Sequence, residues 1–238
     1  MLRCIARLWV LAVVMAVPAL LMPPGAGAII GGSADGAIGH PNVGFILAVD
    51  QAGRLADACT GTLISSTAVL TAAHCLADGE RYFVSFDPTV DLTTKGNTFL
   101  PTAGFRKNDQ YDVGVLRLAQ ATTIEPAELP DLGVLDQDRK GTAFTHVGYG
   151  MDSPPSQTPY DYTHFTRRTL MSSLTKVTGT QLSTRSPDGS LCKGDSGGPV
   201  FSGDGAVVAL GNYANAHCQG QNSGPRLDIE PVRSFLRQ

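Results

Sequence analysis

Charged and aromatic residues are scarce in this sequence. Of its 238 residues, 16% are charged and 7% are aromatic, and Trp9 is the single tryptophan. The 18 basic residues are outnumbered by 21 acidic ones, so the chain lacks the basic excess that a nucleic-acid partner requires. Its 42% of apolar residues is too high for a disordered chain, and glycine does not recur at every third position as in collagen. A folded, loop-rich globular protein remains.

Long apolar runs are also missing. The run at residues 8–22 is shorter than the roughly 20 residues that a membrane-spanning helix needs. It follows Arg3 and Arg7 and precedes a small-residue segment at 26–28, which is the layout of a cleavable secretory signal. We therefore predict a signal peptide at 1–28, cut after its last alanine, and a secreted protein without a membrane segment. An uncleaved membrane anchor is the alternative.

Cysteine is limited to five residues. The predicted cut removes Cys4 and leaves an even number, Cys59, Cys75, Cys192 and Cys218. None of these has the paired Cys-x2-Cys or Cys/His spacing that a zinc site needs. Because exported proteins meet an oxidising environment, we expect two disulfides and no metal ion.

Short apolar segments rich in β-branched residues alternate with turn residues, and no long stretch has the helical period of 3.6. This pattern predicts an all-β sandwich or barrel, with strands at 43–49, 61–64, 68–73, 82–86, 113–118, 143–149 and 206–213. One short helix is expected near the end, opened by Pro231. The polar stretch 120–140 is expected to connect two halves.

Three separate segments carry residues for nucleophilic catalysis. Glycines flank Ser196 in the segment 194–199, where they would let backbone N–H groups approach the hydroxyl. His74 closes an expected apolar strand, and Asp112 precedes another. Alone, the histidine would be a core or loop residue and the aspartate a turn residue. Together they supply what a serine nucleophile needs, a base and an acid that orients it. An α/β-hydrolase is disfavoured, because it places its acid and histidine after the serine, where only His217 remains.

The sequence resembles the trypsin/chymotrypsin family of serine endopeptidases, and its two-disulfide form resembles their bacterial secreted members. The resemblance covers residues 29–238 and rests on Ile29-Ile30-Gly31-Gly32, the segment from Cys59 to Ala-Ala-His74-Cys75, Asp112, Gly148-Tyr149-Gly150 and the hexapeptide around Ser196. It implies an all-β fold of two packed six-stranded antiparallel barrels with a short C-terminal helix. The first barrel would span about 29–125, the second about 140–228 and the helix about 230–238.

The resemblance implies a role for each residue of the three segments. His74 would be the general base and then the general acid, Asp112 its orienting partner and Ser196 the nucleophile. The N–H groups of Gly194 and Ser196 would form the oxyanion hole. The disulfides implied are Cys59–Cys75 and Cys192–Cys218.

The resemblance also implies an activation device. A free α-amino group at Ile29 would pair with Asp195 and order the oxyanion loop. Relatives usually carry a basic residue before this position, but here it is Ala28, the predicted signal-peptidase site. We therefore expect signal removal itself to create the active terminus.

The primary specificity pocket is expected to be apolar. The resemblance places Ser190 at its floor and Leu191 beside it, with Tyr213, Ala214 and Gly224 at the walls. Serine cannot form an ion pair with arginine or lysine, so Leu, Met, Phe or Tyr is expected before the scissile bond, with smaller residues as the alternative. Whether Asn212, which replaces a serine of the family, supports the triad acid stays open.

A secreted monomer acting on polypeptide substrates is the leading interpretation, with proteinaceous inhibitors as further partners and no cofactor. A catalytically silent protease-like binding protein is one alternative. An esterase-biased serine hydrolase is the other.

Overall fold

The computed structural model describes residues 29–36, 39–151, 163–212 and 217–238. The predicted signal peptide, Tyr213 and Ala214 lie outside the described residues. No helix in the described part of the chain has the length and apolar character to cross a membrane.

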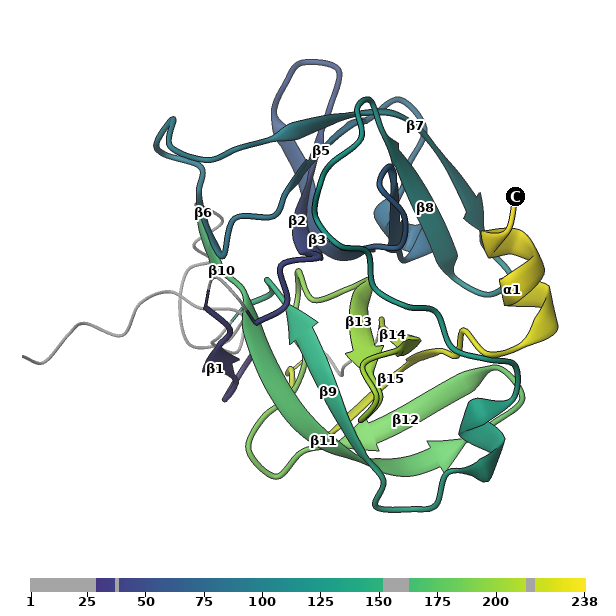
Figure 1. Ribbon diagram of the computed structural model, residues 1–238. Helices are drawn as coiled ribbons and strands as arrows, with labels where there is room; N and C mark the ends of the chain where they lie inside the picture. The colour runs from purple at the N-terminus through teal and green to yellow at the C-terminus, as the bar shows by residue number, and fades with distance from the viewer. Residues whose placement is uncertain (1–28, 37–38, 152–162, 213–216) are drawn as a thin grey trace, which may run out of the picture.

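Six antiparallel strands close into the first barrel, in the order β2-β3-β4-β8-β7-β5 (Figure 1). Their bounds are β2 Val43–Val49, β3 Leu55–Leu63, β4 Ala68–Thr71, β5 Arg81–Ser85, β7 Leu100–Asn108 and β8 Val113–Leu118. Alternate residues of these strands point inward, as the period of two in a strand dictates. Ile46, Leu63, Val69 and Leu116 fill the interior and are almost fully buried.

The second barrel follows the order β14-β13-β9-β11-β12-β15, with β1 paired to the edge of β11. The bounds are β1 Ser33–Ala34, β9 Ala143–Gly148, β11 Arg168–Val177, β12 Gln181–Arg185, β13 Gly198–Phe201, β14 Val207–Gly211 and β15 Gln221–Pro225. A bridge between Ala209 and Arg226 brings β14 and β15 together and nearly closes the barrel. The prediction of two six-stranded antiparallel barrels is confirmed.

A shared core joins the barrels. Phe45 and Val113 of the first barrel pack in one cluster with Val147, Tyr149 and Leu210 of the second. A two-stranded sheet of β6 (Thr89–Asp91) and β10 (His164–Thr166) adds a second link. Because burial of apolar surface drives this packing, the two barrels are held against each other where the candidate site lies.

The C-terminal helix α1 (Glu230–Leu236) lies against the first barrel although it follows the second in sequence (Figure 1). Its buried face consists of Val232 and Phe235. Arg106 of β7 places its guanidinium 4.5 Å from the centre of the Phe235 ring and also donates to the carbonyl groups of Phe235 and Leu236. These donors satisfy carbonyl groups that a helix end leaves without partners.

Several expected elements end elsewhere than predicted. The expected strand 68–73 ends at Thr71, and a 3-10 turn, η1 (Ala73–Cys75), follows it. His74 therefore lies in this turn and not at the end of a strand, because the chain bends where the N–H of Cys75 bonds to the carbonyl of Ala72. The polar connector 120–140 contains a further short turn, η2 (Val134–Gln137).

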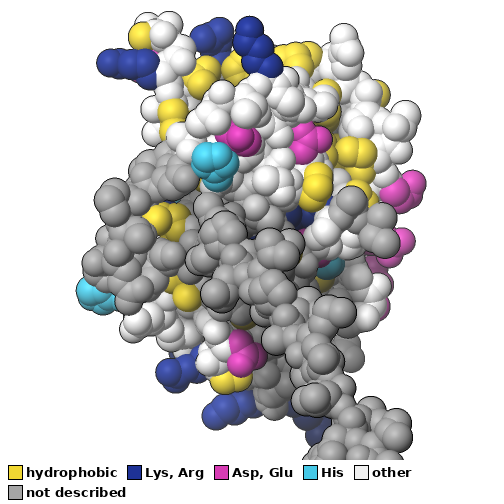
Figure 2. All heavy atoms as spheres, turned by 90° about the vertical axis from the view of Figure 1, so that its left-hand side faces the viewer, with side chains coloured by type: hydrophobic (Ala, Val, Ile, Leu, Met, Phe, Trp, Pro, Cys, Tyr) yellow, Lys and Arg dark blue, Asp and Glu magenta, His cyan; other side chains and the backbone are white. Residues whose placement is uncertain are grey.

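The face seen in Figure 2 carries basic side chains at its upper and lower edges, with acidic side chains between them. Apolar side chains lie among polar ones over the visible part of this face. Neither sign of charge dominates there.

Candidate active site

Strand register places His74 beside Asp112. In the antiparallel pair of β4 and β8, Thr71 lies opposite Gly114, so the residues that follow Thr71 meet those that precede Gly114. The N–H of His74 donates to Oδ1 of Asp112 at 3.0 Å, and its ring Nδ1 lies 2.9 Å from Oδ2. Asp112 has φ of 53°, in the left-handed region where aspartate is tolerated better than most residues. The first barrel thus supplies both residues.

The pair shifts the titration of both groups. The hydrogen bond to Asp112 raises the pKa of His74 above its ordinary 6.5, and burial only partly opposes this. Burial raises the pKa of Asp112, but the hydrogen bonds from His74 and Asn212 outweigh burial and hold it below 3.8. The arrangement therefore favours an ionised carboxylate beside a histidine that readily accepts a proton.

Asn212 connects this pair to the second barrel. Its Nδ2 donates to Oδ2 of Asp112 at 2.7 Å and to the Asp112 carbonyl at 3.1 Å, while its Oδ1 accepts the N–H of Gly197 at 3.2 Å. The open question of whether Asn212 reaches the acid is thus answered by direct contact. A carboxylate that accepts such hydrogen bonds is stabilised in its charged form.

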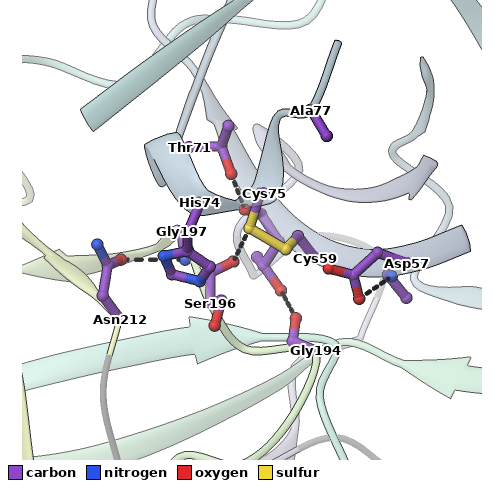
Figure 3. The surroundings of a disulfide bond; sticks show 12 residues. Asp57, Cys59, Thr71, His74, Cys75, Ala77, Gly194, Ser196, Gly197 and Asn212 are labelled. Atoms are coloured by element: carbon purple, nitrogen blue, oxygen red, sulfur yellow. Dashed lines mark hydrogen bonds between the residues drawn. A yellow bond between two sulfur atoms is a disulfide. The ribbon is translucent and has the colours of Figure 1, made fainter. Parts of the chain in front are cut away.

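Ser196 lies in the loop before β13, opposite His74. Its carbonyl accepts the N–H of Thr60 at 2.9 Å, which ties the loop to β3 of the first barrel. Gly197, the next residue, has φ of 78°, and a Cβ there would lie 2.1 Å from Oγ1 of Thr71. Only glycine fits this close approach of loop and barrel. His74 and Ser196 line one cavity of about 270 Å³ (Figure 3).

The disulfide between Cys59 and Cys75 borders the same cavity, and Figure 3 shows it next to His74 and Ser196. A cross-link over 16 positions stabilises by about 3 kcal/mol in the chain-entropy model. A second disulfide joins Cys192 to Cys218, so the loop that leads to Ser196 and the segment before β15 are linked. Both bonds restrain segments that carry site residues.

Asp195, beside the serine, is buried with no basic partner in the described part of the chain. From the described residues its carboxylate accepts two hydrogen bonds, from the N–H of Gly150 at 2.7 Å and from the N–H of Cys192 at 2.8 Å. Burial raises its pKa to about 7, although these two donors work against the shift. A buried carboxylate with so little compensation favours either protonation or a cation.

Ile29 is fully buried, and it packs against the segment that precedes Cys192. Its side chain packs with Leu170 and Leu191, and Leu191 directly precedes Cys192, a donor to Asp195. Ile30 and Ser190 exchange two backbone hydrogen bonds of 3.1 Å each. Ile29 and Ile30 therefore pack against the second barrel, beside the segment that leads to Ser196.

The expected specificity residues are only partly described. Ser190 is buried, and its Oγ donates to Oδ1 of Asn222 at 2.7 Å, an oxygen that also accepts the N–H of Leu191 at 3.0 Å. Gly224 lies in β15, where a Cβ would meet the carbonyl of Leu210 at 1.9 Å. Asn222 was not found from the sequence, because no local pattern marks a strand residue that reaches a distant loop.

Comparison with known proteins identifies the family. The family model described as Trypsin matches residues 29–230. Trypsin delta of Drosophila melanogaster is 24% identical over 92% of this chain and 91% of its own length. Trypsin alpha-4 of Lucilia cuprina is 25% identical over 93% of this chain and 91% of its own.

Solved structures agree on the fold. HL collagenase superposes with a TM-score of 0.72 at 19% identity, covering 88% of this chain and 97% of that one. Human heparin binding protein gives 0.68 at 18% identity, covering 88% and 95%. At this identity the likeness shows the fold alone, whereas the family model spans most of the sequence. The chain therefore belongs to the trypsin family and is a serine endopeptidase.

Proposed function

We propose that the protein is a secreted endopeptidase that cleaves peptide bonds through an acyl-enzyme on Ser196. The observation that carries the proposal is the cavity lined by both His74 and Ser196, with Asp112 in contact with the far side of the histidine ring. A serine hydroxyl is a weak nucleophile until a base removes its proton, and this arrangement supplies one.

In the proposed reaction, Oγ of Ser196 forms a bond to the substrate carbonyl carbon as Nε2 of His74 takes its proton. Asp112 stabilises the imidazolium that results and keeps its Nδ1–H oriented. The N–H groups of Gly194 and Ser196 would donate to the oxyanion. His74 then protonates the departing amine, and water, activated by the same histidine, hydrolyses the ester. The reaction involves no change of oxidation state, and Ser196 regains its proton when the acid product leaves.

Activation is proposed to begin with signal removal. Cleavage before Ile29 creates an ammonium group, and the buried carboxylate of Asp195 is the acceptor with which it would pair. The family match begins at residue 29, which supports a functional boundary there. Amino-terminal sequencing of the exported protein tests this step, because any other first residue contradicts it.

Apolar primary specificity is supported by the uncharged groups at the expected pocket floor. The side chains of Ser190 and of Asn222, which accepts its hydroxyl, are both uncharged, so neither offers a negative charge to arginine or lysine. Profiling cleavage sites on a peptide library is the direct test. Cutting after leucine, methionine, phenylalanine or tyrosine supports the assignment, whereas predominant cutting after arginine or lysine overturns it.

The nucleophile is tested by labelling with a sulfonyl fluoride. The native protein should lose peptidase activity as one label attaches, and Ser196→Ala should take up none. An unlabelled, inactive native protein would favour a binding role instead. Matched ester and peptide substrates complete the test, because turnover of the ester alone would indicate an esterase.

A further inference from the structure

Thr60 binds the loop that carries the candidate oxyanion donors through two of its polar groups, its hydroxyl and its N–H. It is fully buried in β3, and its hydroxyl donates to the carbonyl of Gly194 at 2.8 Å while accepting the N–H of Tyr149 at 3.0 Å (dashed line at Gly194 in Figure 3). Its own N–H donates to the carbonyl of Ser196 at 2.9 Å, and its carbonyl accepts Oγ1 of Thr71 at 2.8 Å. A side chain of the first barrel thus holds the backbone of the second.

The two peptide groups on either side of the Gly194 Cα are held by different partners. The peptide between Lys193 and Gly194 is fixed through the Lys193 carbonyl, which accepts the N–H of Met151 at 2.8 Å. The N–H and C=O of a trans peptide point in opposite directions, so this contact directs the Gly194 N–H away from Met151. The following peptide is fixed through the Gly194 carbonyl, by the hydroxyl of Thr60.

Gly194 needs this restraint because its backbone rotates easily. Its φ of 93° is a conformation that glycine alone enters freely, and glycine leaves it as freely. A rotation about its N–Cα bond would change the direction of the Gly194 N–H relative to the Ser196 N–H. The Thr60 hydroxyl opposes that rotation from one side of the Cα, and Met151 opposes it from the other.

We propose that Thr60 is a positioning residue of the oxyanion hole, which holds the Gly194 N–H in the orientation that binds the developing oxyanion. This inference rests on the proposed acyl-enzyme function. Oxyanion donors act because they are oriented before the reaction, and a misplacement of about 1 Å can cost roughly a hundredfold in rate. The contact should therefore affect the transition state more than substrate binding.

The chain offers a matched control two positions further along the same strand. Thr62 is also fully buried in β3, but its hydroxyl has no hydrogen-bond partner among the described residues. Residues two apart in a strand point to the same side. Thr60→Val and Thr62→Val therefore remove the same atom from similar surroundings, and only the first removes a contact to Gly194.

The experiment compares both valine variants and Thr60→Ser in the mature enzyme, with active sites counted by sulfonyl fluoride titration. For Thr60→Val we expect kcat per active site to fall by about 10- to 100-fold with KM within about threefold. The inhibition constant of a peptide boronate, whose tetrahedral adduct places an oxygen in the oxyanion hole, should rise by the same factor. Thr60→Ser and Thr62→Val should stay within about threefold of the native enzyme.

The outcomes separate the two proposals. An active native enzyme whose Thr60→Val variant keeps kcat and boronate affinity overturns the role of Thr60 alone. A loss shared equally by Thr62→Val would mark a packing effect and would also overturn it. A native protein with neither turnover nor label overturns the proposed function instead. Thr60→Ala carries the same expectation without the added methyl group, so poor folding of the valine variant leaves the question decidable.

Discussion

A protein that begins at Ile29 should be more stable near pH 7 to 8 than one that carries a single extra alanine before it. In the extended form the buried carboxylate of Asp195 accepts two N–H groups of described residues, and burial raises its pKa to about 7 from the ordinary 3.8. A shift of one pKa unit corresponds to about 1.4 kcal/mol, so ionising this carboxyl costs the folded state roughly 4 kcal/mol. A free ammonium at Ile29 should recover much of this.

The two forms should differ in the sign of their pH dependence. Between about pH 4 and 7 the folded extended form binds a proton on Asp195 that the unfolded chain has lost, so its stability falls as the pH rises. In the form that begins at Ile29 the carboxylate is paired and this fall should be absent. Its pairing with the amine is lost only as the pH rises through the raised pKa of that amine, above about 8.

Urea unfolding followed by circular dichroism between pH 4 and 9 measures the effect. Both proteins carry Ser196→Ala, which prevents self-digestion. Asp195→Asn in both forms serves as the control, because it should remove the difference between them. Identical pH dependence of the two forms would refute the pairing and the reasoning that leads to it.

Three further predictions concern the candidate triad, Asn212 and a buried ion pair. The kcat/KM should decline as the pH falls through a midpoint above 6.5, because Asp112 raises the pKa of His74. In pH–rate profiles Asp112→Asn should move this midpoint to lower pH, and an unmoved midpoint would contradict the pairing. Asn212→Ala should lower kcat about tenfold and Asn212→Ser by less, since a hydrogen bond to a charged group contributes about 1.5–3 kcal/mol. An unchanged kcat of Asn212→Ala in steady-state kinetics would contradict a role for the amide. Arg167→Met should lower the free energy of unfolding in urea by about 3–5 kcal/mol, because it leaves the buried carboxylate of Asp35 without the guanidinium 2.8 Å away. A loss under 1 kcal/mol would count against a stabilising role of this ion pair.

Strands with continuous apolar runs were predictable, and strands that mix polar and apolar residues on each face were not. The strands β2 and β8 have the predicted bounds because their apolar residues are buried on both faces or nearly so. The strand β11 was missed because Ser172 points into the core while Met171 is exposed, the reverse of their hydropathy. Tertiary pairing on both edges of β11 overrides the local signal.

Contacts between the barrels could not be predicted from local pattern. The triad candidates are recognisable because each stands in a distinctive segment, and the register of β4 and β8 then brings two of them together. Thr60 looks like any polar strand residue, and its importance depends on a loop 134 positions away. Asn222 reaches Ser190 over 32 positions in the same way. The contact of Thr60 follows from how the two barrels face each other, and that of Asn222 from how distant segments of the second barrel meet.

The attachment of α1 to the first barrel has a consequence for motion. The chain leaves the first barrel once through the connector 120–140 and returns to it at the end, where Arg106 binds the last turn of the helix. Because the two barrels are joined both by this connector and by α1, they cannot rotate about a single linker as about a hinge. His74 of the first barrel and Ser196 of the second are thus held at a fixed distance before any substrate binds. No part of the substrate's binding energy has to be used to bring the two barrels together.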